Sequence, residues 1–273
     1  MRTLVHLSDL HFGRVDEALL APLQQAIASL NPDVVVVSGD LTQRARVAQF
    51  QAARAFLDTL PSPQIIVPGN HDVSLHNVVR RFLRPLDRYR RLVTDDLEPF
   101  FSDAEIAIVG INSARSMTIK AGRINVDQIA RVRERFAQAS PQAIRIVVTH
   151  HPFDVPHAHG KDIVGRATMA MDAFAACGVD LFLAGHLHLT HTVNTASRYR
   201  IPGYAALVVQ AGTATSTRRR DESNSFNAIR IEPARIAIQP HVWNADGGRF
   251  EPSTVTTFDR GSDGWSRIQS GVA

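Results

Sequence analysis

Short apolar runs alternate with helical periodicities along the first two thirds of the chain. The runs predict buried strands at residues 4–7, 34–37, 65–67, 106–111, 144–148 and 181–183. Between them, apolar residues three and four positions apart predict helices at residues 18–30, 50–60, 126–136 and 167–176. Strands that alternate with helices are typical of a layered α/β fold.

The pattern changes after residue 190, where only short strands are predicted. They cover residues 190–193, 205–210, 227–231 and 236–243. The last segment is rich in Gly, Ser and Asp, and forms either an edge strand near residues 254–258 with a tail, or a largely disordered end. We favour the strand, and expect one main domain at residues 1–245 followed by an edge strand and tail at residues 246–273.

The composition is that of a soluble globular protein and limits the chemistry. The 273 residues carry a formal charge of +4, and because Lys120 and Lys161 are the only lysines, most of the positive charge is arginine. Arginine suits phosphate recognition, although a high arginine content also follows from genome base composition. The charge permits an anionic substrate, and we expect no stable nucleic-acid partner. Cys177 is the only cysteine, which excludes an internal disulfide and a thiolate metal cluster.

The sequence carries no segment that predicts a membrane location or secretion. No apolar run approaches the roughly 18 residues that a transmembrane helix needs. The N-terminus enters a strand directly, at residues 4–7, without a charged and apolar leader. We therefore expect a cytoplasmic protein.

Five polar motifs each begin where a predicted strand ends. In chain order they are Asp9-Leu10-His11, Gly39-Asp40, Gly69-Asn70-His71-Asp72, His150-His151-Pro152 and Gly185-His186-Leu187-His188. Open α/β sheets place ligands at the carboxyl ends of their strands, so we expect these motifs to meet at one edge. A single aspartate is more simply a turn former or helix cap, and a single histidine a solvated loop residue. The ordered set of carboxylates, amide and imidazoles predicts ligands for two divalent metals that share one carboxylate.

The order Asp-x-His, Gly-Asp, Gly-Asn-His-Asp, His-x-Pro and Gly-His-x-His resembles that of the calcineurin-like metallophosphoesterases, over residues 3–243. The resemblance implies an α/β fold, a four-layer α-β-β-α sandwich of two mixed sheets with a dimetal site at their loop edge. Residues 1–245 would then be the catalytic domain, and the short strands after residue 190 would fit the second sheet. The segments HLSDLHFG and GDLTQRA resemble the class III cyclic-nucleotide phosphodiesterases more than the Ser/Thr phosphatases.

The resemblance also implies a role for each motif residue. The metal ligands would be Asp9, His11 and His188 for one ion, Asn70, His150 and His186 for the other, and Asp40 as the bridge. The His-x-Pro spacing selects His150 rather than His151. His71 would be the catalytic histidine beside the scissile phosphate, and Asp72 its orienting partner.

This residue set suits two divalent ions drawn from Mn²⁺, Fe²⁺/Fe³⁺, Zn²⁺ and Co²⁺. Such a pair can bind a phosphate and generate a bridging hydroxide that attacks phosphorus. His71 could stabilise the transition state or protonate the leaving alkoxide, and Asp72 could fix its tautomer. We therefore expect a phosphodiesterase that acts on a cyclic nucleotide or a similar small anionic diester.

Three other functions stay open at this point. They are a lipid- or sugar-nucleotide pyrophosphatase, a DNA nuclease, and a non-catalytic phosphate-binding scaffold. The oligomeric state, including a homodimer, is also open.

Several further residues invite a functional or a structural interpretation. Arg80, Arg81, Arg84, Arg88, Arg90 and Arg91 form either a solvated helix face or a basic rim. Residues 218–220, all arginine, are expected in a solvated loop, and His157 and His159 in a surface loop or a pocket wall. Asn112 and Ser113 end a strand and could line the site, whereas His191 is expected to support it.

Overall fold

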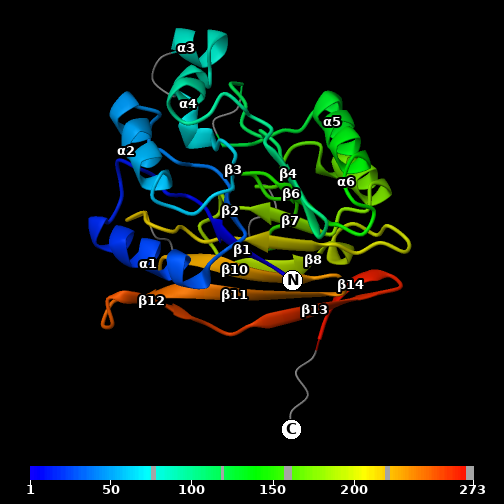
Figure 1. Ribbon diagram of the computed structural model, residues 1–273. Coiled ribbons are helices and arrows are strands. Elements are labelled where there is room, and N and C mark those ends of the chain that lie inside the picture. Colours follow the sequence, from blue (N-terminus) through cyan, green and yellow to red (C-terminus); the bar gives the residue numbers. More distant parts are fainter. Residues whose placement is uncertain (75–77, 118–119, 157–161, 219–221, 269–273) are drawn as a thin grey trace.

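Two mixed sheets form the centre of the molecule (Figure 1). The computed structural model describes residues 1–74, 78–117, 120–156, 162–218 and 222–268. The first sheet has the order β14-β13-β11-β10-β1-β2-β3, with β12 paired to β11. Its strands are β1 (Arg2–Leu7), β2 (Val34–Val37), β3 (Gln64–Ile66), β10 (Ser225–Glu232), β11 (Arg235–Asn244), β12 (Arg249–Pro252), β13 (Thr256–Gly261) and β14 (Gly264–Arg267). Strands β1 to β3 are parallel, and β10 runs antiparallel to β1.

The second sheet has the order β4-β5-β6-β7-β9-β8. Its strands are β4 (Phe100–Ser102), β5 (Ile106–Gly110), β6 (Ile144–Val148), β7 (Leu181–Ala184), β8 (His191–Asn194) and β9 (Leu207–Gln210). The four inner strands are parallel, and β4 and β8 are antiparallel edge strands. The carboxyl ends of β5, β6, β7 and β9 therefore lie together.

Helices cover the outer face of each sheet. The first sheet packs against α1 (Leu20–Leu30) and α2 (Val47–Leu57), and the second against α5 (Val126–Ala137) and α6 (Ala167–Ala176). Two shorter helices, α3 (Val78–Leu83) and α4 (Asp87–Leu92), follow β3 in the chain. The predicted four-layer α-β-β-α sandwich is confirmed (Figure 1).

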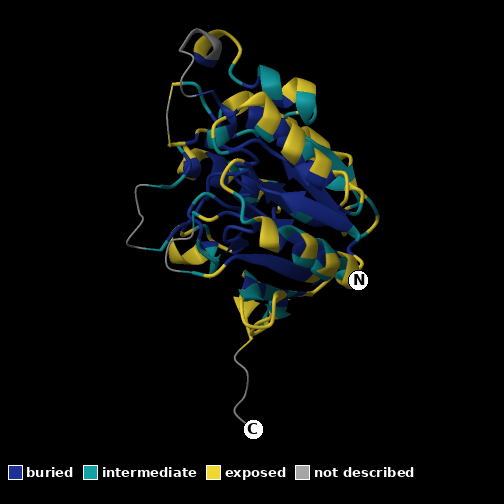
Figure 2. Ribbon diagram, turned by 90° about the vertical axis from the view of Figure 1, so that its left-hand side faces the viewer, coloured by how far each residue is buried: buried dark blue, intermediate teal, exposed yellow. Residues whose placement is uncertain are grey.

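Strand alternation explains the layers. Leu4, Val34 and Val36 point between the two sheets, whereas their neighbours Val5 and Val35 point toward α1 and α2. Because both of its faces are buried, β2 consists of four valines. Figure 2 shows the central strands as the buried interior of the molecule.

Local signals fix the helix ends. At the start of α5 the side chain of Asn125 accepts a hydrogen bond from the Gln128 backbone N–H at 2.9 Å, and the Gln128 side chain accepts from the Asn125 N–H at 3.2 Å. Helix α1 ends at Asn31, which adopts a left-handed conformation before Pro32.

The late strands differ from the sequence-based expectation. They do not make up a second sheet by themselves, because β8 and β9 join the sheet of β7 while β10 to β14 join the sheet of β1. A strand, β13, is present where an edge strand was expected, but it lies between β11 and β14 rather than at the edge. β12 also pairs with β11, so the first sheet continues past residue 245. Among the described residues, no helix has both the length and the apolar character that a membrane crossing requires.

Candidate metal centre

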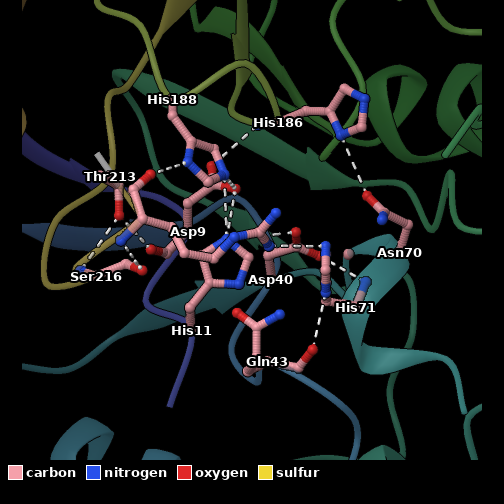
Figure 3. Close-up of polar contacts among 12 residues, drawn as sticks. Asp9, His11, Asp40, Gln43, Asn70, His71, His186, His188, Thr213 and Ser216 are labelled. Atoms are coloured by element: carbon pink, nitrogen blue, oxygen red, sulfur yellow. Dashed lines mark hydrogen bonds and ion pairs between the residues drawn. The ribbon is translucent and has the colours of Figure 1, made fainter. Parts of the chain in front are cut away.

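The predicted ligands meet at the carboxyl edge of the two sheets (Figure 3). The first sheet contributes the residues after β1, β2 and β3, which are Asp9, His11, Asp40 and Asn70. The second sheet contributes His150 after β6, and His186 and His188 after β7. Residues that are far apart in the sequence, and that follow strands of two different sheets, thus form one cluster, as expected for ligands at strand ends.

Five of these residues have strained backbones. The φ angles are positive for Asp9 (53°), His11 (51°), Asp40 (53°), His186 (75°) and His188 (58°). A non-glycine residue in this region costs roughly 1–3 kcal/mol, and such residues concentrate at functional sites. Backbone hydrogen bonds stabilise these conformations. The Asp9 N–H donates to the Gly39 carbonyl at 3.1 Å, and the His11 N–H donates to the Asp40 carbonyl at 2.9 Å.

The first cluster contains one carboxylate and two imidazoles. His188 Nε2 lies 3.1 Å from Asp9 Oδ1, His11 Nε2 lies 3.4 Å from the same oxygen, and the two Nε2 atoms are 3.1 Å apart. Ligands about 2.0–2.2 Å from a tetrahedral metal stand about 3.3–3.6 Å from one another. The spacing of the three atoms is therefore close to that of ligands around one ion.

The second cluster contains one amide oxygen and two imidazoles. Asn70 Oδ1 is 3.1 Å from both His150 Nε2 and His186 Nδ1, and the two nitrogens are 3.3 Å apart. This triangle has the same dimensions as the first one.

Asp40 lies between the clusters with one oxygen toward each. Its Oδ2 is 3.7 Å from His11 Nε2, and its Oδ1 is 3.4 Å from His150 Nε2. Its Oδ1 also accepts a hydrogen bond from the His71 backbone N–H at 2.8 Å. A carboxylate in this position can bridge two metals.

The outer atoms of the imidazoles aim their inner nitrogens at the clusters. His150 Nδ1 donates to the Ser38 carbonyl at 2.8 Å, and His188 Nδ1 donates to the Arg218 carbonyl at 2.9 Å, which leaves both Nε2 lone pairs inward. Asp9 Oδ1 is buried, and no group in the described part of the chain donates a well-directed hydrogen bond to it. A buried carboxylate oxygen without a donor is costly unless a cation neutralises it, so the residues fit a bound metal.

The electrostatics agree with a cation site. Burial alone would raise the pKa of Asp9 and Asp40, but His188 and His150 respectively outweigh it and hold both pKa values well below the usual range. Burial, followed by the charge of His150, lowers the pKa of His186 to about 4. Burial also lowers the pKa of His11, despite the adjacent carboxylates. Burial would lower the pKa of His150 and of His188, but Asp40 and Asp9 respectively outweigh it, so the pKa of His150 is raised to about 9 and that of His188 is also raised. Because metal binds neutral imidazole, a bound cation would displace the protons of these two rings.

Comparison with known proteins assigns the chain to a family. The family model for calcineurin-like phosphoesterases matches residues 2–189. The chain belongs to this family. A glycerophosphodiester phosphodiesterase, GpdQ, from Enterobacter lignolyticus is 26% identical over 203 residues, which cover 69% of this chain and 72% of that protein. A cAMP/cGMP dual specificity phosphodiesterase from Mycobacterium tuberculosis is 28% identical over 274 residues, covering 85% of this chain and 77% of that protein.

The solved structures agree in fold. A purple acid phosphatase from yellow lupin superposes with a TM-score of 0.67 at 12% identity. The match covers 93% of this chain and 53% of the lupin enzyme, so this chain spans about half of that protein's length. The calcineurin-like phosphoesterase described here is thus a metal-dependent phosphoester hydrolase of a family that uses two metals.

Within this phosphoesterase, the geometry favours His150 over its neighbour as a ligand. A ring nitrogen of His151 lies near those of His150 and His186, but both of its nitrogens are engaged elsewhere. Nε2 donates to the Lys120 carbonyl at 2.8 Å, and Nδ1 lies 2.8 Å from the Ser113 hydroxyl. Ser113, expected to line the site, instead fixes the ring that packs 4.6 Å from that of His186.

The expected role of Asp72 needs correction. His71 Nδ1 donates to the Gln43 carbonyl at 2.8 Å, so a backbone group orients this ring (Figure 3). The Asp72 carboxylate accepts from the Leu41, Thr42 and Gly69 backbone N–H groups and from the Thr42 hydroxyl. It therefore ties together the two loops that carry Asp40 and Asn70, and among the described residues it forms no hydrogen bond with the His71 ring.

One residue beside His71 was not among the site residues predicted from the sequence. Arg218 is half-buried rather than solvated, and its Nη1 donates to His71 Nε2 at 3.1 Å. It follows β9, which is parallel to β7 and ends at the same edge. That position was the available signal, because every predicted ligand also follows a strand that ends there.

The remaining candidates have mainly structural roles. Arg81 is buried and donates to the Ser116 and Ser74 carbonyls, and Arg88 donates to the Ala45 carbonyl, so the arginine-rich segment is not a uniform solvated face. Asn112 accepts from the backbone N–H two residues later, and His191 is half-buried on β8 outside the donor clusters. The side chain of Arg80, together with His157, His159, Arg219 and Arg220, lies outside the described residues.

Proposed function

We propose that this enzyme is a phosphodiesterase that acts on a cyclic nucleotide or a similar small diester. Its two ions, drawn from Mn²⁺, Fe²⁺/Fe³⁺, Zn²⁺ and Co²⁺, would occupy the two donor clusters. The observation that carries the proposal is the pair of matching triangles of donor atoms joined by Asp40. The Enterobacter and Mycobacterium relatives are both phosphodiesterases, which supports a diester substrate.

The residues have distinct tasks in this reaction. When bound, two divalent ions polarise the phosphoryl group and make water a competent nucleophile at neutral pH. His71 is placed to act as the general acid. The centroid of its ring lies 5.0 Å from that of His11, in an edge-on arrangement, and its Nδ1–H donates to the Gln43 carbonyl. Its Nε2 therefore faces the reacting group, where a proton on this atom can be given to the leaving alkoxide.

A substrate comparison tests the proposal. We expect kcat/KM for bis-p-nitrophenyl phosphate to exceed that for p-nitrophenyl phosphate at one pH and one Mn²⁺ load. A dianionic monoester gains ground-state binding from two metals, which does not raise turnover unless the transition state gains more. Chelator-treated protein is the control. Preference for the monoester would reject the diesterase and leave the metal site intact.

A wider panel separates the remaining functions. Cyclic AMP, a lipid-linked pyrophosphate and single-stranded DNA address the nucleotide, pyrophosphatase and nuclease alternatives in turn. Activity with none of these or the nitrophenyl esters, despite full metal occupancy, would favour a binding scaffold. Cytoplasmic localisation stays a prediction from the sequence.

A further inference from the structure

The loop after β9 is built into the metal centre. The Thr213 hydroxyl donates to the Asp9 carbonyl and the Thr215 hydroxyl to the Leu10 carbonyl, each at 2.7 Å. The backbone carbonyl of Arg218 accepts from His188 Nδ1, and its N–H donates to the Ser216 hydroxyl at 3.0 Å. The backbone of Arg218 is therefore fixed by the residues that hold the first donor cluster.

The guanidinium of Arg218 has an unusual partner. It can only donate, so its contact with His71 Nε2 requires this nitrogen to be the acceptor and the ring proton to reside on Nδ1, where Gln43 accepts it. No carboxylate of the described chain forms an ion pair with Arg218. A half-buried positive charge that has no carboxylate partner among the described residues, next to a metal centre, is suited to bind an anion.

We propose that Arg218 binds the substrate, and that its guanidinium donates to a non-bridging phosphoryl oxygen beside His71. This inference rests on the proposed diesterase function. In the free enzyme the guanidinium is held on His71 Nε2. When the substrate arrives, the phosphoryl oxygen takes over the donor. His71 Nε2 is then released from the guanidinium.

The alternative is that Arg218 only supports the metal site through its backbone. Side-chain substitutions separate the two roles, because the carbonyl that accepts from His188 is present in every variant. Arg218→Gln removes the charge, and Arg218→Lys keeps it without the planar fork. Arg267→Gln is the matched control, because Arg267 is an exposed arginine of β14. This strand contacts Ala205, which precedes β9, and therefore lies at the opposite end of β9 from Arg218.

Three quantities are measured on Mn²⁺-loaded full-length protein. They are the metal content, the KM and kcat for bis-p-nitrophenyl phosphate, and the inhibition constant of inorganic phosphate. For Arg218→Gln we expect full metal content, a kcat/KM lowered on the order of 10- to 100-fold and a phosphate inhibition constant raised about 10-fold, the range of a charge-assisted hydrogen bond. Arg218→Lys should recover part of both effects, and Arg267→Gln should equal the wild type.

Two results would overturn the proposal. One is an Arg218→Gln enzyme with wild-type KM and phosphate inhibition. The other is a variant that loses metal in proportion to its activity, which would make Arg218 a support for His188. If the wild-type protein hydrolyses no diester, the proposed function fails by itself. Equilibrium titration of the metal-loaded protein with inorganic phosphate then still tests Arg218, since the Gln variant should bind it about 10-fold more weakly.

Discussion

The two ends of the sandwich both contain buried carboxylates, and these are satisfied in opposite ways. At the end away from the site, Asp180 precedes β7, and its Oδ2 accepts from the Arg145 backbone N–H at 2.9 Å. Its Oδ1 accepts from Trp265 Nε1 at 3.0 Å and from Arg260, whose guanidinium lies over the Trp265 ring. Both oxygens of this carboxylate have donors. At the metal end, Asp9 is fully buried, but its Oδ1 has no well-directed donor in the described structure.

The backbone shows the same contrast. Near Asp180, left-handed positions are occupied by glycine, as at Gly178, Gly203 and Gly264. A side chain at position 264 would meet the Ala205 carbonyl at 2.3 Å. At the metal end, five Asp and His residues accept the strain that glycine avoids. One end is arranged for stability, whereas the other keeps strain and unpaired polar atoms that a bound cation would satisfy.

The largest effect should come from Asp40→Ala. Since Asp40 offers one oxygen to each cluster, we expect the variant to lose affinity for both ions and almost all activity. Asp9→Ala should mainly weaken one ion. These losses should exceed the roughly 10–100-fold that substitutions around metal ligands cost. Titration with Mn²⁺ and elemental analysis measure the two affinities. Normal two-site binding in Asp40→Ala would refute the bridge.

A smaller effect is expected for His71→Ala. A ring nitrogen of His71 lies near the ligand atoms of His11 and Asp40. Both ring nitrogens are engaged, by the Gln43 carbonyl and by Arg218, so metal should stay bound. We expect kcat to fall roughly 10²–10⁴-fold, the range of a general acid. Elemental analysis beside steady-state kinetics decides between the roles. Loss of an ion would make His71 a ligand instead.

The sequence located the candidate metal ligands, but not the groups that contact the His71 ring. Its motifs could be located because each one follows an apolar strand, and parallel strands end at one edge. The orienting group of His71 could not be found in this way, because Gln43 acts through a backbone carbonyl that any residue would provide. Arg218 could not be distinguished from Arg219 and Arg220 without the path of the loop.

Sheet pairing was the second limit. The layers follow from periodicity, which depends on neighbours in the chain. The pairing of β1 with β10 joins residues more than two hundred positions apart, and the sequence of neither strand specifies which strand it pairs with. The second strand of the C-terminal hairpin, β14, was not predicted from the sequence, because its docking depends on the contact of Trp265 with Asp180.

Asp180→Ala tests the stable end. The change leaves the Trp265 Nε1–H and the Arg145 backbone N–H without their acceptor, so we expect a loss of about 2–4 kcal/mol in the free energy of unfolding. Metal content and kcat/KM at low temperature should equal the wild type, because the donor clusters are at the other end. Denaturant unfolding of the metal-free protein measures the loss. A metal defect in the folded variant would contradict the separation of the two ends.

The smallest effect is expected for Arg260→Gln. The side chain of Arg260 is 38% exposed, and exposed charge pairs contribute about 0–1 kcal/mol. Asp180 keeps its other two donors in this variant, so the free energy of unfolding should fall by less than about 1 kcal/mol, and the difference should shrink in high salt. Denaturant unfolding at two salt concentrations, with Asp180→Ala measured in parallel, checks both statements. If Arg260→Gln were as damaging as Asp180→Ala, the charge pair rather than the complete set of donors would hold this end together.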